Sequence, residues 1–171
     1  MRSVIALAAC AAVLVLVDVS IVAKERVLES GRVVYLEIGP VDPRSIMQGD
    51  YMALSFRIAG SLRQAAPRLS RGTEIFGRRE RDTEDGKVVV ALDSRSVASF
   101  RRLEDGKPLS TDEIALRYRV REGRVKFATN AFFFQEGTGK RYEGARYGEF
   151  RVGADGEVLL TGLRGKDLEP L

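Results

Sequence analysis

The chain divides into an apolar N-terminal run and a long segment in which apolar and polar residues alternate. Val4–Ala23 is a run of 20 residues that only Asp18 and Ser20 interrupt. At about 1.5 Å of rise per residue, such a helix crosses a hydrocarbon core of about 30 Å. The run therefore predicts an N-terminal transmembrane anchor over residues 1–23, followed by one domain over residues 24–171.

Three other interpretations of the apolar run compete with an anchor. A cleaved secretory signal normally has an apolar region of about 7–15 residues, which is shorter than this run. The spelling Leu7-Ala8-Ala9-Cys10 fits a lipoprotein signal, but the apolar stretch before Cys10 is short. A buried core helix of this length does not normally lie at a terminus. Signal-anchor logic, with a short N-terminal flank and a long following domain, favours placing the domain outside the cytoplasm.

Asp18 is the unusual residue of the predicted span. A charged side chain costs about 2.5–3.5 kcal/mol at the centre of a membrane helix and less near its end. Asp18 either reaches interfacial water or makes a polar contact with another membrane helix. It is therefore a candidate contact to a membrane partner.

Period-two alternation dominates the domain and predicts half-buried strands. It is clearest over residues 51–58 and 114–121, where every second residue is apolar. Val34–Ile38 is a shorter example, and the continuous apolar run Val88–Leu92 predicts an interior strand. Further strands are predicted at Phe132–Phe134, Phe150–Val152 and Val158–Leu163.

Turn signals separate these strands. Asp85-Gly86, Asp105-Gly106 and Asp155-Gly156 are type I′ hairpin signals, because both central residues of that turn take positive φ. Glu122-Gly123 is a weaker fourth signal. Strands joined by hairpins predict a mainly β fold, an antiparallel sandwich or a partly open barrel.

Helices are a minor part of this prediction. Ser61 and Gln64 have the spacing of a capping box, and apolar residues continue at helical spacing to Leu69. Pro67 lies inside that pattern, so the helix is expected to be short or kinked. Residues 138–147 are a second candidate for a short helix.

The composition removes whole classes of chemistry. The chain has no histidine, and its one cysteine, Cys10, lies in the apolar run. Histidine-based triads, His-ligated metal sites and multi-cysteine metal sites are therefore excluded, and no cofactor is expected. The formal net charge is +4, a modest excess that matters only where the charges gather.

Residues 40–56 read PVDPRSIMQGDYMALSF, a turn-rich segment that leads into a strand. Asp50 is placed to accept hydrogen bonds from nearby backbone N–H groups and to hold the turn. Arg44 is a plausible partner for Asp42 or Asp50.

This segment resembles the family named for its Gly-Asp-Tyr-x-x-Leu-x-Tyr motif. Phe56 replaces the last tyrosine, so this chain lacks that hydroxyl. The segments at 133–137 and 146–149 also look like the family. The resemblance implies a bacterial membrane-anchored protein, often encoded beside a multi-pass membrane protein, and it brings no established catalytic residues. The motif positions that match are Gly49, Asp50, Tyr51 and Leu54.

Two kinds of enzyme remain conceivable without histidine. A Ser-Lys hydrolase would use Ser45, but the segment lacks the serine-to-glycine spacing and the proline of type I signal peptidases. Paired carboxylates from Glu136, Glu143 and Glu149 would suit glycoside chemistry, although acids of this kind are more often turn and surface residues. We therefore do not favour an enzyme.

A basic hairpin is the strongest charge feature. Arg117, Arg119 and Arg121 share one strand face, and Arg124 and Lys126 follow the Glu-Gly turn. The set is suited to phospholipid heads, acidic glycans or the carboxylates of a partner, or it forms a solvated sheet face. On the exposed face no aromatic residues interleave with this set, and the domain is expected outside the cytoplasm, so nucleic acid is not an expected partner.

The run Phe132–Phe134 breaks the alternation of its strand. At least one ring must point away from the face that buries the others. Either a second layer covers that ring, or it forms an exposed apolar patch for a membrane partner.

These observations predict a single-pass protein of the bacterial inner membrane whose β-rich domain lies on the extracytoplasmic side. Its expected role is that of an accessory or interaction subunit of a multi-pass membrane protein. A His-free hydrolase and an anion-binding module are the alternatives. The candidate functional surface comprises Asp42, Arg44, Gly49, Asp50, Tyr51 and Leu54, with Glu136, Tyr142 and Tyr147 as a second group.

Overall fold

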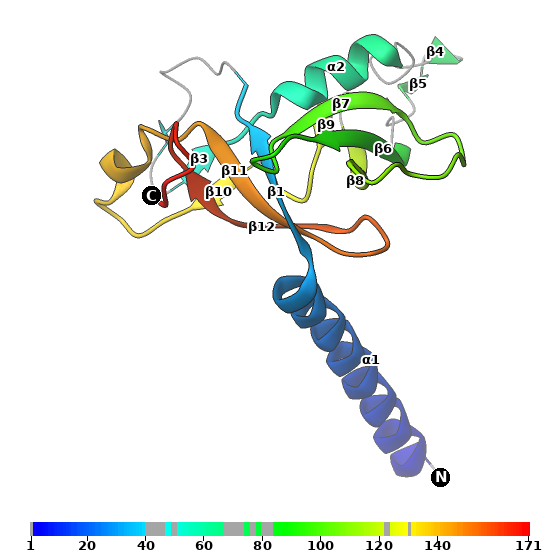
Figure 1. Cartoon of the computed structure of the whole chain (residues 1–171). Coiled ribbons are helices and arrows are strands. Elements are labelled where there is room, and N and C mark those ends of the chain that lie inside the picture. Colours follow the sequence, from blue (N-terminus) through cyan, green and yellow to red (C-terminus); the bar gives the residue numbers. More distant parts are fainter. Residues whose placement is uncertain are drawn as a thin grey trace.

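A long helix projects from a β-rich domain in the computed structural model (Figure 1). Helix α1 (Arg2–Ser30) leads directly into the first strand, and a second helix, α2 (Arg57–Ala65), lies on the domain. The structure describes residues 2–39, 47–48, 51–66, 74–75, 78–79, 84–121, 124–129 and 131–171.

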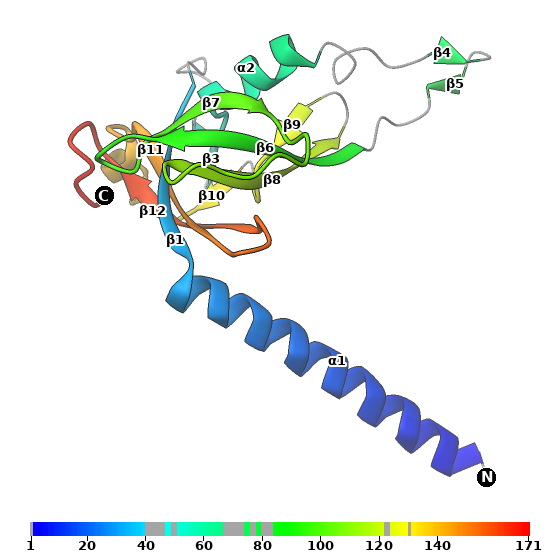
Figure 2. The same cartoon turned by 45° about the vertical axis from the view of Figure 1, so that its right-hand side comes forward.

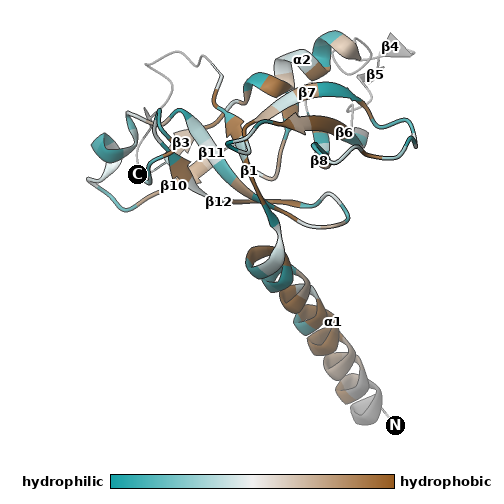
Figure 3. Ribbon diagram, viewed as in Figure 1, coloured by the Kyte–Doolittle hydropathy of each residue, from teal (hydrophilic) through white to brown (hydrophobic). Residues whose placement is uncertain are grey.

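Helix α1 has no polar face. Its large apolar side chains are exposed, from Leu7 at 71% to Val22 at 42%, and Figure 3 shows much of the described part of the helix in the apolar colour, with hydrophilic stretches toward the domain. Among the residues that the structure describes, no helix reaches the length and apolar character needed to cross a membrane. The predicted N-terminal helix is present, and it extends to Ser30, beyond the predicted boundary at Lys24.

The first sheet has the order β1-β11-β12 and is antiparallel throughout. Val34 and Leu36 of its edge strand point into the core and are 0% and 1% exposed, as the alternation predicts. The turn at Asp155-Gly156 joins its last two strands into the predicted hairpin. The predicted type I′ geometry is wrong, because Gly156 has a positive φ of 86° whereas Asp155 does not have a positive φ. The strands are β1 (Arg32–Glu37), β11 (Tyr147–Val152) and β12 (Val158–Arg164).

The second sheet has the order β7-β6-β8-β9. Strand β6 lies between two neighbours, which confirms the interior strand predicted from its apolar run. Strand β8 alternates as predicted, with Leu116 and Val120 buried and Arg117 and Arg119 exposed. The strands are β6 (Glu84–Leu92), β7 (Ala98–Leu103), β8 (Glu113–Arg121) and β9 (Arg124–Lys126).

Smaller elements complete the domain. A third sheet has the order β10-β3-β2, and β4 pairs with β5. The apolar faces of the sheets and one face of α2 enclose a single core, so the domain resembles half of a barrel (Figures 1 and 2). The remaining elements are β2 (Met47–Gln48), β3 (Tyr51–Ala53), β4 (Glu74–Ile75), β5 (Arg78–Arg79), β10 (Ala131–Phe133) and the 3₁₀ turn η2 (Gly139–Tyr142). The mainly β, antiparallel fold class is confirmed.

The strand predicted over residues 51–58 is wrong beyond Ala53. Helix α2 begins at Arg57 and buries Ile58, Ala59 and Leu62, which have helical spacing. Ile58 suits both patterns, because it continues the alternation of the strand and also begins the apolar face of the helix.

The predicted capping box is also wrong, since Ser61 lies inside α2 and the N-cap residue is Phe56. The helix ends at Ala65, and Ala66 has φ −130° and ψ 77°. Proline disfavours the helical conformation in the residue before it, so Pro67 stops the helix rather than kinking it.

Two of the predicted hairpin turns do not form. Asp85-Gly86 lies inside strand β6, where Gly86 faces Tyr118 across the sheet. A Cβ atom on Gly86 would lie 2.6 Å from the hydroxyl oxygen of Tyr118, so glycine is needed here for close approach rather than for a turn. Asp105-Gly106 is a turn with Gly106 at φ +77°, but it belongs to the loop 104–112 that carries the chain from one side of β6 to the other.

The weakest turn signal is correct. Strands β8 and β9 pair antiparallel on either side of Glu122-Gly123, a dipeptide that itself lies outside the described residues. The helix predicted over residues 138–147 shrinks to η2, because Gly139 and Gly144 lower its helical propensity and Tyr147 already begins β11.

Candidate functional site

The family motif continues into β3, the central strand of the third sheet. Tyr51 begins β3, which pairs with β10 and β2. Leu54 is 4% exposed and belongs to the core, so it supports the segment from inside and is not part of a surface. Phe56 is also buried and packs edge-on against Phe150 with ring centroids 5.2 Å apart, an apolar setting that suits phenylalanine in place of the motif's tyrosine. Four candidates, Asp42, Arg44, Gly49 and Asp50, lie outside the described residues, as does Ser45.

Tyr51 contacts the ring that breaks the alternation of β10. Phe133 is the register partner of Tyr51, and the two ring centroids lie 5.8 Å apart. Phe133 is 74% exposed, whereas Met52, the next residue of β3, is 3% exposed on the opposite face. The prediction that one phenylalanine of the run points away from the core is confirmed, and the aromatic pair Tyr51–Phe133 lies at the surface.

Tyr142 lies with the other two phenylalanines. Its ring is 5.1 Å from that of Phe132 and 5.2 Å from that of Phe134, and all three are packed against the core. Because neighbouring residues of a strand point to opposite faces, the structure places Tyr142 and Tyr51 on opposite sides of β10. The two candidate groups therefore do not form one site, and Glu136 is exposed in the turn between β10 and η2.

Tyr147 belongs to a structural network. It begins β11, pairs with Glu37 of β1 and Arg164 of β12, and is half-buried. Two residues later, Glu149 is 9% exposed and binds the guanidinium of Arg164, while the Thr161 hydroxyl donates to its other carboxylate oxygen at 3.2 Å. These contacts hold the first sheet together and leave this carboxylate engaged.

The predicted carboxylate set is not assembled. Glu136 and Glu143 are exposed, whereas Glu149 is buried against Arg164. Within the described part of the chain, no three acidic or cysteine side chains gather as metal ligands would.

The basic hairpin borders a groove of about 790 Å³. The groove runs between the second sheet, strand β12 and the end of α1. Arg117, Arg119 and Lys126 of the predicted basic set line it. Arg121 instead pairs with Asp85 at 2.8 Å, and Arg124 borders a smaller hollow beside α2.

Two further cationic side chains, which are far from the hairpin in sequence, also line the groove. Lys24 comes from α1 and Lys87 from β6. Lys24 is ion-paired with Glu157 of the β11–β12 turn, and the backbone N–H of Arg117 donates to the Gly156 carbonyl of the same turn at 2.7 Å. The turn thereby joins α1, the first sheet and the second sheet at one end of the groove.

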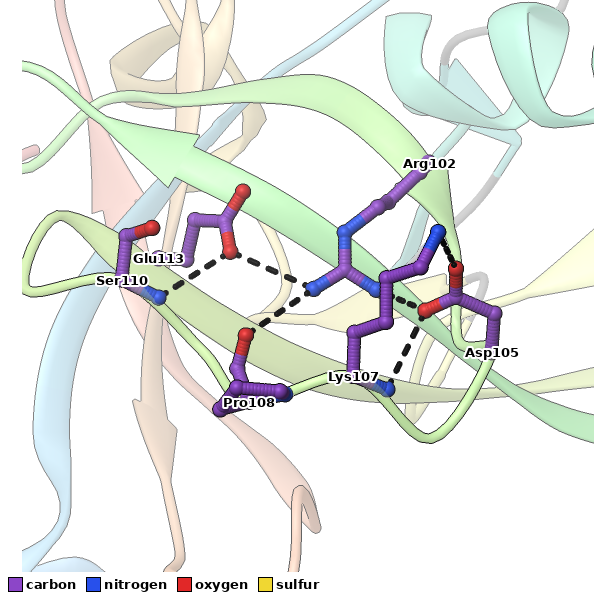
Figure 4. A network of polar contacts seen from close by, with 6 residues as sticks. All are labelled: Arg102, Asp105, Lys107, Pro108, Ser110 and Glu113. Atoms are coloured by element: carbon purple, nitrogen blue, oxygen red, sulfur yellow. Dashed lines mark hydrogen bonds and ion pairs between the residues drawn. The ribbon is translucent and has the colours of Figure 1, made fainter.

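A second charged cluster lies in the loop 104–112 (Figure 4). The guanidinium of Arg102 reaches Asp105, Glu113 and the Pro108 carbonyl, and the ammonium of Lys107 lies 2.7 Å from Asp105. The hydrogen bond from the Lys107 side chain lowers the pKa of the Asp105 carboxyl below its ordinary value. Every charged group of this cluster has an oppositely charged group beside it. The cluster therefore holds the loop in place rather than forming a binding site, and we call it the clasp.

Sequence reasoning missed three features of these surfaces. It did not identify Phe133 as the exposed ring, although register with Tyr51 would have done so. It did not place Lys24 and Lys87 beside the basic hairpin, because only the folded chain brings α1 and β6 together there. It did not pair Glu149 with Arg164, which lies diagonally across from it: the register partner of Arg164 is Tyr147, and that of Glu149 is Gly162.

One of three comparisons with known proteins gives a match. The family model described as GDYXXLXY protein matches residues 13–163, a range that includes the motif at Gly49–Phe56 and both later segments. Neither the curated proteins nor the solved structures contain a match to this chain.

Proposed function

The chain belongs to the GDYXXLXY family, and from that premise we propose that it is a membrane-anchored interaction subunit beside a multi-pass membrane protein. Its anchor is the apolar run Val4–Ala23, and its β domain lies on the extracytoplasmic side of the bacterial inner membrane. The observation that carries the proposal is the aromatic pair at the surface, which joins Tyr51 of the family's motif to the exposed ring of Phe133.

The surface of α1 supports anchoring. An apolar surface without a polar face is typical of a buried or membrane-spanning helix. Removing apolar area from water stabilises such a helix by about 25 cal/mol per Å². The described side chains from Leu7 to Val22 have no covering element. Val4, Ile5 and Ala8 belong to the apolar run in the sequence, but their side chains lie outside those that the structure describes.

The two polar residues of the run differ in a way that fits a partner inside the membrane. The hydroxyl of Ser20 donates to the carbonyl of Leu16 at 2.8 Å, so the helix satisfies it internally. Among the described residues, the carboxylate of Asp18 has no hydrogen-bond or ion-pair partner. Because a polar group in the hydrocarbon region needs a partner, a second helix that donates to Asp18 completes the proposal.

The aromatic pair supports a protein partner for the β domain. Aromatic residues are enriched at the centres of protein interfaces, where they fill pockets and exclude water. Phe133 exposes three quarters of its side chain although its neighbours Phe132 and Phe134 are packed against the core. An apolar ring held at the surface by a paired strand is suited to a pocket on another protein.

Site-specific crosslinking tests the proposal. A photoreactive phenylalanine analogue replaces Phe133 in the full chain, and native membranes are illuminated before the products are identified by mass spectrometry. We expect a covalent product with a multi-pass membrane protein. The matched control carries the same analogue at Arg101, which is exposed on β7 and lies outside the proposed contact.

The substitution Phe133→Ser gives the second arm. We expect loss of the co-purifying membrane protein with an unchanged thermal unfolding temperature, because an exposed ring contributes little to the core. Equal crosslinking from positions 133 and 101, or products that contain only this chain and lipid, would overturn the interaction role.

A further inference from the structure

The groove beside α1 has the charge pattern of an anion site. Five cationic side chains line it against two carboxylates, and both of these carboxylates are already engaged. Asp85 binds Arg121, and Glu157 binds Lys24. The lining cations are Lys24, Lys87, Arg117, Arg119 and Lys126.

Three of these cations form no ion pair among the described residues, although Asp85, which binds Arg121, is the register partner of Arg119 across β6 and β8. Arg117 lies 3.0 Å from Asp155, but no carboxylate of the described residues forms an ion pair with Lys87, Arg119 or Lys126. Arg119 and Lys126 are register partners on adjacent strands, so the fold holds two like charges side by side. Two like charges opposite each other are destabilising, and an anion bound between the two side chains offsets their repulsion.

The other wall of the groove is apolar. Leu159 and Leu160 of β12 line it together with Leu28 of α1, which is 45% exposed. Leu160 packs against the core, whereas Leu159 is half-buried and is not among the residues of the core. A site with a cationic wall and an apolar wall fits an amphipathic anion better than a fully polar one, because each part of the ligand meets its own kind of surface.

The place of the groove identifies which amphipathic anion is available. Lys24, which lines the groove, directly follows the proposed anchor Val4–Ala23. The groove then opens at the level of the lipid headgroups, where basic residues attract anionic lipids. This step rests on the anchoring half of the proposed function.

We propose that the groove binds an anionic phospholipid. Lys87, Arg119 and Lys126 hold its phosphate, and Leu28 and Leu159 contact its acyl chains. An acidic glycan would satisfy the cations but would leave the apolar wall without a partner, so the lipid is the ligand that uses both walls.

Lipid titration of the full chain in a neutral detergent tests this site. Dioctanoyl phosphatidylglycerol is titrated by calorimetry, with dioctanoyl phosphatidylcholine as the zwitterionic lipid of equal chain length. We expect saturable binding of the anionic lipid that is at least tenfold tighter and that weakens as salt is raised. Equal binding of the two lipids would overturn the proposal.

The double variant Arg119→Gln with Lys126→Gln removes the facing cations. We expect its affinity for phosphatidylglycerol to fall about 30-fold, because each of the two charges removed near an anionic surface lowers the affinity roughly fivefold. The matched control is Arg95→Gln with Arg101→Gln, two exposed arginines away from the groove. Circular dichroism melting confirms that both variants fold, and equal affinities of the two would contradict the site.

Two soluble anions test whether the bound anion belongs to a lipid. Glycerol phosphate carries the headgroup charge without acyl chains, and trigalacturonate represents an acidic glycan. We expect both to bind at least tenfold more weakly than the lipid, and Leu159→Gln to weaken binding of the lipid but not of glycerol phosphate. Binding of either soluble anion as tightly as the lipid, with no effect of Leu159→Gln, would show that the groove takes a soluble anion instead.

The outcomes separate this proposal from the interaction role. Lipid titration in detergent requires neither a partner nor insertion, and crosslinking from position 133 requires no groove residue. Loss of lipid binding with retained crosslinking would overturn only the lipid site, and the reverse result would overturn only the partner.

Discussion

Two charged regions border strand β6, and each contains an Asp-Gly pair together with arginine and lysine. In the loop 104–112, Arg102 and Lys107 are neutralised by Asp105 and Glu113 (Figure 4). Along the groove, Lys87, Arg119 and Lys126 form no ion pair among the described residues. Charges that neutralise one another hold a loop in place, whereas charges that the fold leaves unneutralised beside a hollow are available to a ligand.

The glycines of the two regions should lose very different amounts of stability on the same substitution, and this is the largest expected effect. Gly86→Asn forces a side chain into the ring of Tyr118, 2.6–2.7 Å from the position of a Cβ, and should cost about 2 kcal/mol of unfolding free energy. Gly106→Asn should cost only about 0.5 kcal/mol, because asparagine tolerates positive φ and nothing lies within 4 Å of its Cβ.

Thermal and urea unfolding of the full chain measure both glycine variants, with Gly106→Ala as the control for positive φ. Alanine should be worse than asparagine at position 106 and better than asparagine at position 86. The same ranking at both positions would mean that the two glycines serve one purpose, and the distinction drawn between turn and close approach would be wrong.

These glycines also show which features of the fold could be predicted from the sequence and which could not. Alternation and turn pairs are local, and they were sufficient for β8, β9 and the β11–β12 hairpin. The role of Gly86 depends on a ring in another strand, so the dipeptide alone could not separate it from Gly106. Helix α2 was missed at its start because Ile58 satisfies both the strand period and the helix period.

The candidate sites also divide into features that local sequence predicts and features that depend on contacts between distant parts of the chain. The parity of a strand was enough to predict that one ring of Phe132–Phe134 faces outward, and the basic face of β8 was predicted residue by residue. The groove itself was not predictable, because Lys24 and Glu157 close one of its ends from opposite ends of the chain. The motif positions before Tyr51 lie outside the described residues, so their role stays a prediction.

Arg102→Ala should give the next largest effect. Its guanidinium is the one group of the clasp that contacts Asp105, Glu113 and the Pro108 carbonyl together, and its side chain is 26% exposed. Its loss leaves the Glu113 carboxylate, 12% exposed, without a cation, so we expect a cost of about 1.5 kcal/mol. Arg101→Ala on the same strand is the matched control, and equal losses in the two unfolding curves would disprove the clasp.

Removing one lysine from each region should change stability in opposite directions. Lys126→Gln relieves repulsion from Arg119 across the strand pair and should stabilise the free protein by about 0.5 kcal/mol. Lys107→Gln removes an ammonium that lies 2.7 Å from Asp105 and should lower the unfolding temperature slightly. Melting curves at low and high salt check this, because both effects should shrink as salt screens the charges. A loss of stability on Lys126→Gln would mean that the groove cation has a structural partner.

The smallest effect is a pH dependence confined to the clasp. The pKa of Asp105 is lowered, first by the hydrogen bond from Lys107, so the folded state favours its ionised form. The contribution of Asp105 is therefore complete above the pKa of an unfolded aspartate, about pH 4, and is lost as the pH falls through the lower pKa of the folded state. Melting temperatures of the parent chain and of Asp105→Asn should differ near neutral pH and converge toward about pH 3. Asp112→Asn in the same loop should show no such convergence, since its carboxylate makes no contact within the described residues; a gap at Asp105 that stays constant with pH would show that its carboxylate charge contributes nothing to the clasp.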